Sequence, residues 1–167
     1  MPSKMLFVAV ISLSVLAVSS TWAGKYNPTL SIGDKAPDWK DLPGTDDKKH
    51  SLADFADKDI VVVVFTCNSC PYAVDYEDRL VAFAREMEES KSKVGLVAIN
   101  VNKVPEDLLP AMKKRAESKK FNFPYLFDET QKIAKDYGAE RTPEFFVFNK
   151  NRELVYTGAM DDSSDGK

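Results

Sequence analysis

Two patterns of apolar and polar positions alternate along the middle of the chain. Uninterrupted apolar runs at Ile60–Phe65 and Val94–Val101 predict strands that are covered on both faces of a sheet. Pro71–Glu89 instead repeats apolar residues every three or four positions among charges, which predicts an amphipathic helix. Pro110–Lys119 predicts a second helix, because proline suits the first turn and basic residues suit the last.

Shorter elements follow in the second half of the chain. Phe123–Phe127 predicts a strand, and Glu129–Tyr137 predicts a helix that Gly138 ends in the left-handed conformation. Phe145–Phe148 and Leu154–Gly158 predict the two strands of a hairpin. Because strands alternate with helices before this hairpin, the pattern predicts an α/β domain with a largely parallel central sheet.

The first 23 residues predict a signal peptide. Lys4 precedes an uncharged, mostly apolar run at Met5–Val18, which is shorter than the roughly 20 residues of a membrane span. Small residues follow and end at Ala23, where we expect cleavage; an uncleaved N-terminal anchor is the alternative. Residues 24–167 would then form an exported domain, periplasmic or secreted, without a membrane span, in a compartment where disulfides form.

Composition agrees with one ordinary globular domain. The chain has 167 residues, of which 44% are hydrophobic and 29% charged, with a net charge of −3. A mildly acidic protein has no electrostatic attraction for nucleic acid, so we expect no nucleic-acid partner. Polar residues dominate from about position 159, which predicts a frayed or truncated C-terminus.

The two cysteines of the chain directly follow the first predicted buried strand. The spacing places Cys67 at or just before the N-terminus of the next helix and Cys70 inside its first turn. Unpaired N–H groups and the helix dipole stabilise a thiolate at such a position. Cys70 is close enough to attack a mixed disulfide formed by Cys67, so the pair predicts a redox-active disulfide with no other cofactor.

The same cysteine spacing also occurs in structural disulfides and in metal sites. A structural disulfide across so short a loop gives little stabilisation, yet it stays open at this point. A copper site with two thiolates also stays open, whereas zinc needs four ligands and His50, the only histidine, lies well upstream. In either of these cases the chain would be a non-catalytic binding domain. Because the cysteine pair offers only two ligands, we expect no metal. The acidic residues Asp75, Glu77 and Asp78 are expected on the solvated face of the helix.

Two further segments belong to the candidate site. Thr142–Pro143 precedes a predicted strand, and a cis bond there would bring its backbone against the disulfide. This backbone would offer hydrogen-bonding groups to an extended substrate peptide. Tyr72, which follows the cysteine pair and a proline, is expected to cover the pair.

These motifs resemble those of a known superfamily. Phe65–Tyr72, with Thr142–Phe148 downstream, looks like the thioredoxin-like superfamily, and Gly33–Asp38 resembles the opening of its redoxin branch. That branch contains alkyl hydroperoxide reductase/thiol-specific antioxidant proteins and exported thiol-disulfide oxidoreductases. The similarity covers about residues 31–158. It implies a central mixed β-sheet flanked by helices, with an N-terminal extension and an insert at roughly 102–142.

The resemblance also assigns roles. It implies that Cys67 is the nucleophile, that Cys70 resolves, and that Pro143 is a cis-proline beside the substrate. The implied partners are proteins with thiols or disulfides and a separate redox partner protein. Asn68 and Ser69 stand between the cysteines where strong oxidants carry a histidine, so we expect a middling or reducing potential.

Peroxiredoxins are the main rival within this branch. Their pocket has proline seven and threonine three residues before the reactive cysteine. Here Ile60 and Val64 occupy these places before Cys67, and Val63 and Cys67 occupy them before Cys70. The activating hydroxyl is absent at that spacing, which argues against peroxidase chemistry. An antioxidant peroxidase therefore stays only as the alternative function. Neither a proton acceptor for Cys70 nor the final helix of the family is recognisable in the sequence.

Overall fold

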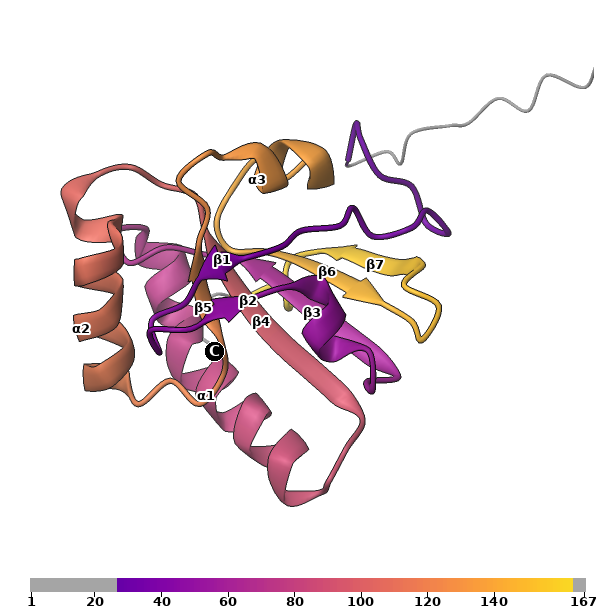
Figure 1. Cartoon of the computed structure of the whole chain (residues 1–167), viewed down its shortest axis with the longest axis horizontal. Coiled ribbons are helices and arrows are strands. Elements are labelled where there is room, and N and C mark those ends of the chain that lie inside the picture. The colour runs from indigo at the N-terminus through magenta and orange to yellow at the C-terminus, as the bar shows by residue number, and fades with distance from the viewer. Residues whose placement is uncertain (1–26, 164–167) are drawn as a thin grey trace, which may run out of the picture.

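A five-stranded mixed sheet forms the centre of the molecule, with strand order β5-β4-β3-β6-β7 (Figure 1). The computed structural model describes residues 27–163, so the predicted signal peptide at 1–23 lies outside the described residues. The strands of this sheet are β3 (Ile60–Phe65), β4 (Val94–Asn100), β5 (Tyr125–Phe127), β6 (Glu144–Phe148) and β7 (Leu154–Gly158).

Parallel and antiparallel pairs share this sheet. Strands β3, β4 and β5 are parallel, whereas β6 runs antiparallel to β3 and β7 antiparallel to β6. The other elements are β1 (Leu42–Pro43), β2 (Lys49–His50), η1 (Leu52–Phe55), α1 (Pro71–Glu89), η2 (Pro105–Asp107), α2 (Leu109–Lys119) and α3 (Lys132–Tyr137). The predicted α/β class and the mixed sheet flanked by helices are thus confirmed.

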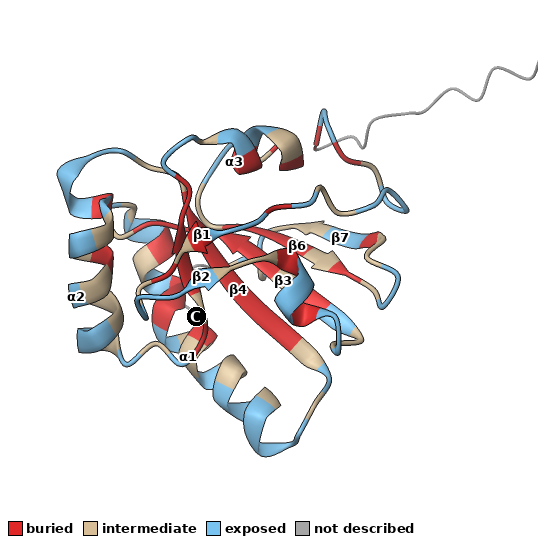
Figure 2. Ribbon diagram, viewed as in Figure 1, coloured by how far each residue is buried: buried red, intermediate tan, exposed pale blue. Residues whose placement is uncertain are grey.

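The strand β3 is covered on both faces, as its apolar run predicts. Val61 and Val63 belong to the core cluster that contains Tyr137 of α3, and Val64 belongs to the cluster that contains Leu80 of α1. Both clusters run along the central strands, which are largely buried (Figure 2). Since side chains alternate between faces, only a continuous apolar run fills both clusters at once.

A buried tyrosine joins the N-terminal segment to α3. The Tyr137 hydroxyl donates to Pro37 O (3.0 Å) and accepts from Trp39 Nε1 (3.2 Å). Burial raises the pKa of Tyr137 well above its usual value of 10, so the phenol keeps its proton and remains a donor.

Tyr137→Phe is expected to lower the free energy of unfolding by about 1–3 kcal/mol, because the Trp39 indole N–H loses its buried acceptor. Urea denaturation measures this change. Tyr156→Phe is the matched control, since that hydroxyl lies on a residue that is 46% exposed. Equal unfolding midpoints for the two variants would contradict the structural role of the Tyr137 hydroxyl.

Two sequence predictions need correction. The helix predicted at Glu129–Tyr137 starts only at Lys132, because Gln131 adopts a left-handed conformation with φ of 61°. Glu77 is 4% exposed rather than solvated. Arg115 of α2 donates two hydrogen bonds to the Glu77 carboxylate (2.8 and 2.7 Å) and so allows its burial. Asp75 and Asp78 are exposed as predicted.

The end of the described chain lies against α1. No helix follows β7 within residues 27–163, and residues 159–163 have no regular secondary structure. Asp161 accepts from the Tyr76 hydroxyl (3.0 Å) and pairs with Arg79, whose hydrogen bond to the carboxylate lowers the pKa of Asp161. In the same described range, no helix is long and apolar enough to cross a membrane.

Candidate active site

The cysteine loop connects β3 to α1. Because Pro71 occupies the first helical position, the helix begins one residue after Cys70, which is its N-cap with φ −81° and ψ 119°. The sequence prediction of Cys70 inside the first turn is therefore wrong by one position. Cys67 lies in the loop three residues before this cap.

Both sulfur atoms meet at Thr142. Cys67 Sγ lies 3.4 Å from Thr142 Oγ1, and the Cys70 thiol donates to Thr142 O at 3.2 Å. The antiparallel pairing of β3 with β6 explains this meeting, since Phe65 stands opposite Glu144 and the residues before Glu144 therefore lie beside the loop after Phe65. Both cysteines are free thiols, and the Thr142–Pro143 bond is cis.

Solvent exposure differs among the expected site residues. Cys67 is only 2% exposed, whereas Cys70 is partly exposed. Tyr72 is 65% exposed on the first turn of α1, so most of its side chain faces solvent rather than the cysteine pair. The structure thus brings Cys67, Cys70 and Thr142 together and leaves Tyr72 exposed to solvent on α1.

A buried carboxylate holds the backbone between the cysteines. Asp107, at the end of η2, is fully buried, and its Oδ1 accepts from the amides of Asn68 (2.6 Å) and Ser69 (3.0 Å). Its Oδ2 accepts from Ser69 Oγ (2.6 Å) and from Asn102 Nδ2 (3.2 Å). Four donors around one carboxyl group suit its ionised form, which only accepts hydrogen bonds.

Neighbouring side chains fix the same loop from other directions. Asn68 Nδ2 donates to Glu106 O (2.7 Å), and Asn68 Oδ1 accepts from the Tyr125 hydroxyl (3.1 Å). Asn100 Nδ2 donates to Asp107 O (2.6 Å), which ties η2 to the end of β4. The cysteine loop is therefore held by β4, β5 and η2 as well as by α1.

The phenol of Tyr125 responds to the charge of this region. Burial chiefly, followed by electrostatic interaction with Cys67 and Asp107, raises the pKa of Tyr125 well above its usual value of 10. The phenol therefore keeps its proton and remains the donor to Asn68.

A second buried carboxylate positions the turn before the cis bond. Glu144 is 6% exposed, and its Oε2 accepts from the amides of Glu140 (2.9 Å) and Arg141 (3.3 Å). Sequence reasoning missed Glu144, although a carboxylate directly before an apolar run was a usable signal. It also missed Asp107, which lies about 40 positions from the cysteines and follows no recognisable pattern.

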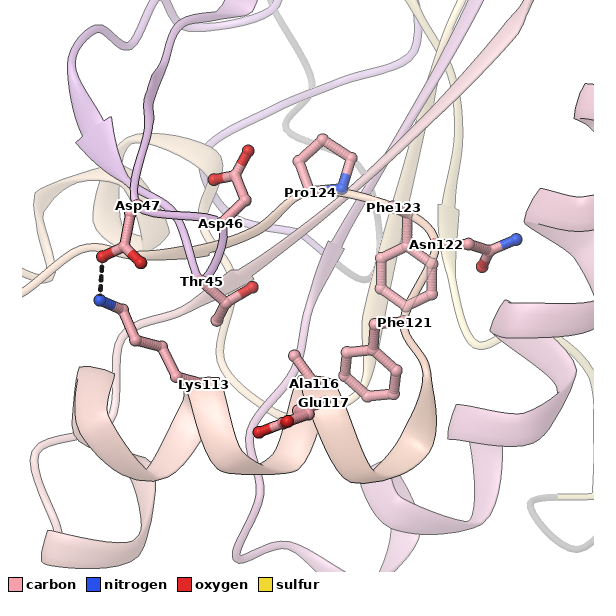
Figure 3. A pocket seen from close by; sticks show the side chains of 10 residues that line it. All are labelled: Thr45, Asp46, Asp47, Lys113, Ala116, Glu117, Phe121, Asn122, Phe123 and Pro124. Atoms are coloured by element: carbon pink, nitrogen blue, oxygen red, sulfur yellow. Dashed lines mark hydrogen bonds and ion pairs between the residues drawn. The ribbon is translucent and has the colours of Figure 1, made fainter.

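Two cavities have different relations to this site. One of about 630 Å³ lies away from the cysteines, between the β1–β2 turn, α2 and the segment before β5 (Figure 3). Its lining includes the ion pair between Lys113 and Asp47, but none of the expected site residues. Another, of about 350 Å³, contacts Pro143, Glu144 and Tyr156, and Pro143 directly follows Thr142, which both sulfur atoms contact.

Between positions 27 and 163, no group of three or more histidine, cysteine, aspartate or glutamate side chains is arranged to hold a metal ion.

Comparison with known proteins identifies the class. The arrangement of the sheet and the helices defines a thioredoxin-like fold, and the family match supports thiol redox chemistry in general. The model of the Redoxin family matches residues 31–166, and the chain belongs to this family. No curated protein matches the chain in sequence.

Solved structures agree with this membership. A hypothetical protein from Sinorhizobium meliloti 1021 is similar at 34% identity and a TM-score of 0.77, over 84% of this chain and 76% of that one. The peroxidoxin BcpB from Mycobacterium tuberculosis shares the fold at 21% identity and a TM-score of 0.66, over 81% of this chain and 90% of that one. The thioredoxin domain of a thiol-disulfide oxidoreductase from Bacteroides vulgatus also shares the fold, at 18% identity and a TM-score of 0.64. This match covers 81% of this chain and 94% of that one.

Proposed function

We propose that this protein is an exported thiol-disulfide oxidoreductase that exchanges the Cys67–Cys70 disulfide with thiols and disulfides of other proteins. The observation that carries the proposal is the meeting of both sulfur atoms at Thr142, which is a geometry for two-step exchange. Membership of the Redoxin family supports thiol redox chemistry in general.

The chemistry is a two-electron exchange. One cysteine thiolate attacks a substrate disulfide, so that a protein–substrate disulfide forms and one substrate sulfur leaves as a thiolate that takes up a proton. The second cysteine then attacks the first, which closes the Cys67–Cys70 disulfide and releases the second substrate thiol. The substrate gains two electrons, and a dithiol redox partner protein restores the two thiols.

The proposed substrate groove lies beside Pro143. We place it in the cavity of about 350 Å³ that is lined by Arg141, Pro143, Glu144 and the end of β7. Pro143 directly follows Thr142, which both sulfur atoms contact, so an extended peptide bound there would bring its disulfide toward the cysteines. We place the exchange in the periplasm or outside the cell, where protein disulfides occur.

Reduction of insulin disulfides by dithiothreitol tests the function. The wild-type protein is expected to accelerate the reaction, and Cys67→Ser and Cys70→Ser each to lose the acceleration completely, since exchange needs both sulfur atoms. Ser163→Ala, at the far end of the described chain, is the control that keeps full activity. A Cys67→Ser/Cys70→Ser protein that accelerates the reaction as well as wild type would refute the proposal.

A thiol peroxidase is the second candidate, favoured by the hydroxyl of Thr142 at 3.4 Å from Cys67 Sγ. In that case hydrogen peroxide would oxidise a cysteine to the sulfenic acid before the disulfide closes. Rapid peroxide consumption with a trapped sulfenic acid, together with no effect on insulin, would replace the first proposal by this one.

A further inference from the structure

One buried carboxylate and one exposed guanidinium line the cavity of about 350 Å³ that contains Pro143. The carboxylate belongs to Glu144, which is 6% exposed, and the guanidinium belongs to Arg141. We propose that Glu144 binds the α-amino group and Arg141 the α-carboxylate of one half of cystine, so that the protein reduces this small disulfide as well as protein disulfides. This inference rests on the proposed exchange function.

Glu144 keeps one oxygen atom for a ligand. Its Oε2 accepts from the amides of Glu140 (2.9 Å) and Arg141 (3.3 Å), which fix the carboxylate at the start of β6. Among residues 27–163, no donor forms a hydrogen bond with Oε1, and no cation pairs with this carboxylate. Because Glu144 lines the cavity, this oxygen is available to an ammonium group that enters there, and such charge-assisted hydrogen bonds are strong.

Arg141 supplies the positive charge of the same cavity. Within the part of the chain that the structure describes, no carboxylate forms an ion pair with its guanidinium, and this includes Glu144. An arginine suits a carboxylate ligand, because its N–H groups form a planar fork that matches the two oxygen atoms. Two opposite charges that line one cavity without pairing leave room for a ligand that has a cationic and an anionic end.

The size and position of the cavity fit a small disulfide. The rest of its wall is uncharged and includes Pro143, Tyr156, Gly158 and Ala159. Its volume is near the lower end of the range of about 300–1,000 Å³ for ligand pockets, so it suits a small molecule. Pro143 directly follows Thr142, which both sulfur atoms contact, so a disulfide bound there lies toward the cysteines. Cystine combines this size with both required charges.

The reaction balances in atoms and electrons. One protein thiolate attacks a sulfur atom of cystine, so that a mixed disulfide forms and one cysteine leaves as a thiolate that takes up a proton. The second protein thiol attacks the mixed disulfide, closes the Cys67–Cys70 disulfide and releases the other cysteine. Cystine gains two electrons and two protons, and the dithiol of the redox partner protein later returns both to the pair.

Three disulfides with the same carbon chain test the two charges separately. Cystine carries both groups, cystamine carries only the amines, and dithiodipropionate carries only the carboxylates. The reduced protein is mixed with each disulfide, and loss of free thiols is followed by mass. Each rate is divided by the rate with dithiothreitol, which removes differences in intrinsic reactivity. Cystine is expected to react about tenfold faster than either of the others, because each of those lacks one charged hydrogen-bonding group.

Charge-neutral variants assign each contact. Arg141→Gln is expected to slow the reactions with cystine and dithiodipropionate about tenfold and to leave cystamine unchanged. Glu144→Gln is expected to slow cystine and cystamine and to spare dithiodipropionate, while its amide oxygen still accepts from the two backbone amides. Arg85→Gln is the matched control, since Arg85 is an exposed arginine of α1 that does not line this cavity.

The pattern across substrates separates binding from a structural defect. A variant that loses the same factor with all three disulfides would overturn the inference, because a distorted site lowers every rate alike. A wild-type rate with cystine no higher than with the other two would also overturn it, and insulin reduction would then continue to support the exchange function. Loss of reaction with insulin as well as with the three small disulfides would refute the exchange function itself.

Discussion

Asp107→Asn is expected to slow insulin reduction about 100-fold, at the low end of the range for loss of a proton acceptor. An asparagine oxygen still accepts from the amides of Asn68 and Ser69, so the loop keeps two of its four hydrogen bonds. It does not take up a proton, however, so the step in which the second cysteine resolves the mixed disulfide loses a buried carboxylate beside the cysteine loop. The initial attack on the substrate disulfide is expected to change little.

Rapid mixing with a disulfide peptide separates these two steps. The mixed disulfide is expected to accumulate in Asp107→Asn and to decay faster as the pH rises, because hydroxide replaces the missing acceptor. Asp128→Asn is the matched control. Asp128 is another buried aspartate, and it caps a loop by accepting from Thr130 N (2.9 Å) and Ile133 N (2.8 Å) away from the cysteines.

Two results would contradict the role of Asp107. Equal slowing of the first and second steps would show that the carboxylate only maintains the loop. Equal losses of activity in Asp107→Asn and Asp128→Asn would attribute the effect to stability. Thermal unfolding of both variants measures that stability directly.

Arg115→Met is expected to cost about 3–5 kcal/mol of unfolding free energy, the largest stability effect of the predicted substitutions. The substitution leaves the Glu77 carboxylate, 4% exposed, without its two hydrogen bonds from the guanidinium. A methionine preserves much of the packing volume, so the loss reflects mainly the unpaired charge. Glu77 and Arg115 join α1 to α2. Urea denaturation followed by circular dichroism measures the loss of unfolding free energy.

An exposed ion pair provides the control for this prediction. Lys132→Met removes the partner of Asp136 on α3, where the lysine side chain is 72% exposed, and is expected to change stability by less than about 1 kcal/mol. Lys119 Nζ lies 3.6 Å from Glu77 Oε2. A loss for Arg115→Met as small as that of the control would show that Lys119 alone neutralises Glu77.

The central elements were predictable because their signals are local. Ile60–Phe65 is a continuous apolar run, and Pro71–Glu89 has a helical period with proline at its start, so both were predicted with the bounds that the structure shows. The meeting of Thr142 with the cysteines was predicted on the condition of a cis Thr142–Pro143 bond, and the resemblance to a family implied that bond. No local pattern connects positions 75 residues apart.

The charged residues of the interior were not predictable in the same way. Glu77 looks like any acidic residue of an amphipathic helix, and its burial depends on Arg115 arriving from another helix. Asp107 reaches the cysteine loop only because η2 folds back over the end of β4. The exposure of Cys67 and Cys70 depends on the same packing, so it does not follow from the sequence spacing alone.

The reduction potential of the Cys67–Cys70 pair tests the central claim most directly. The protein is equilibrated with defined ratios of reduced and oxidised glutathione, and free thiols are counted by alkylation and mass. A single reversible two-electron transition is predicted, nearer to about −270 mV than to about −120 mV, because Asn68 and Ser69 stand between the cysteines where strong oxidants carry a histidine. A pair that stays reduced or stays oxidised at every ratio would contradict the account.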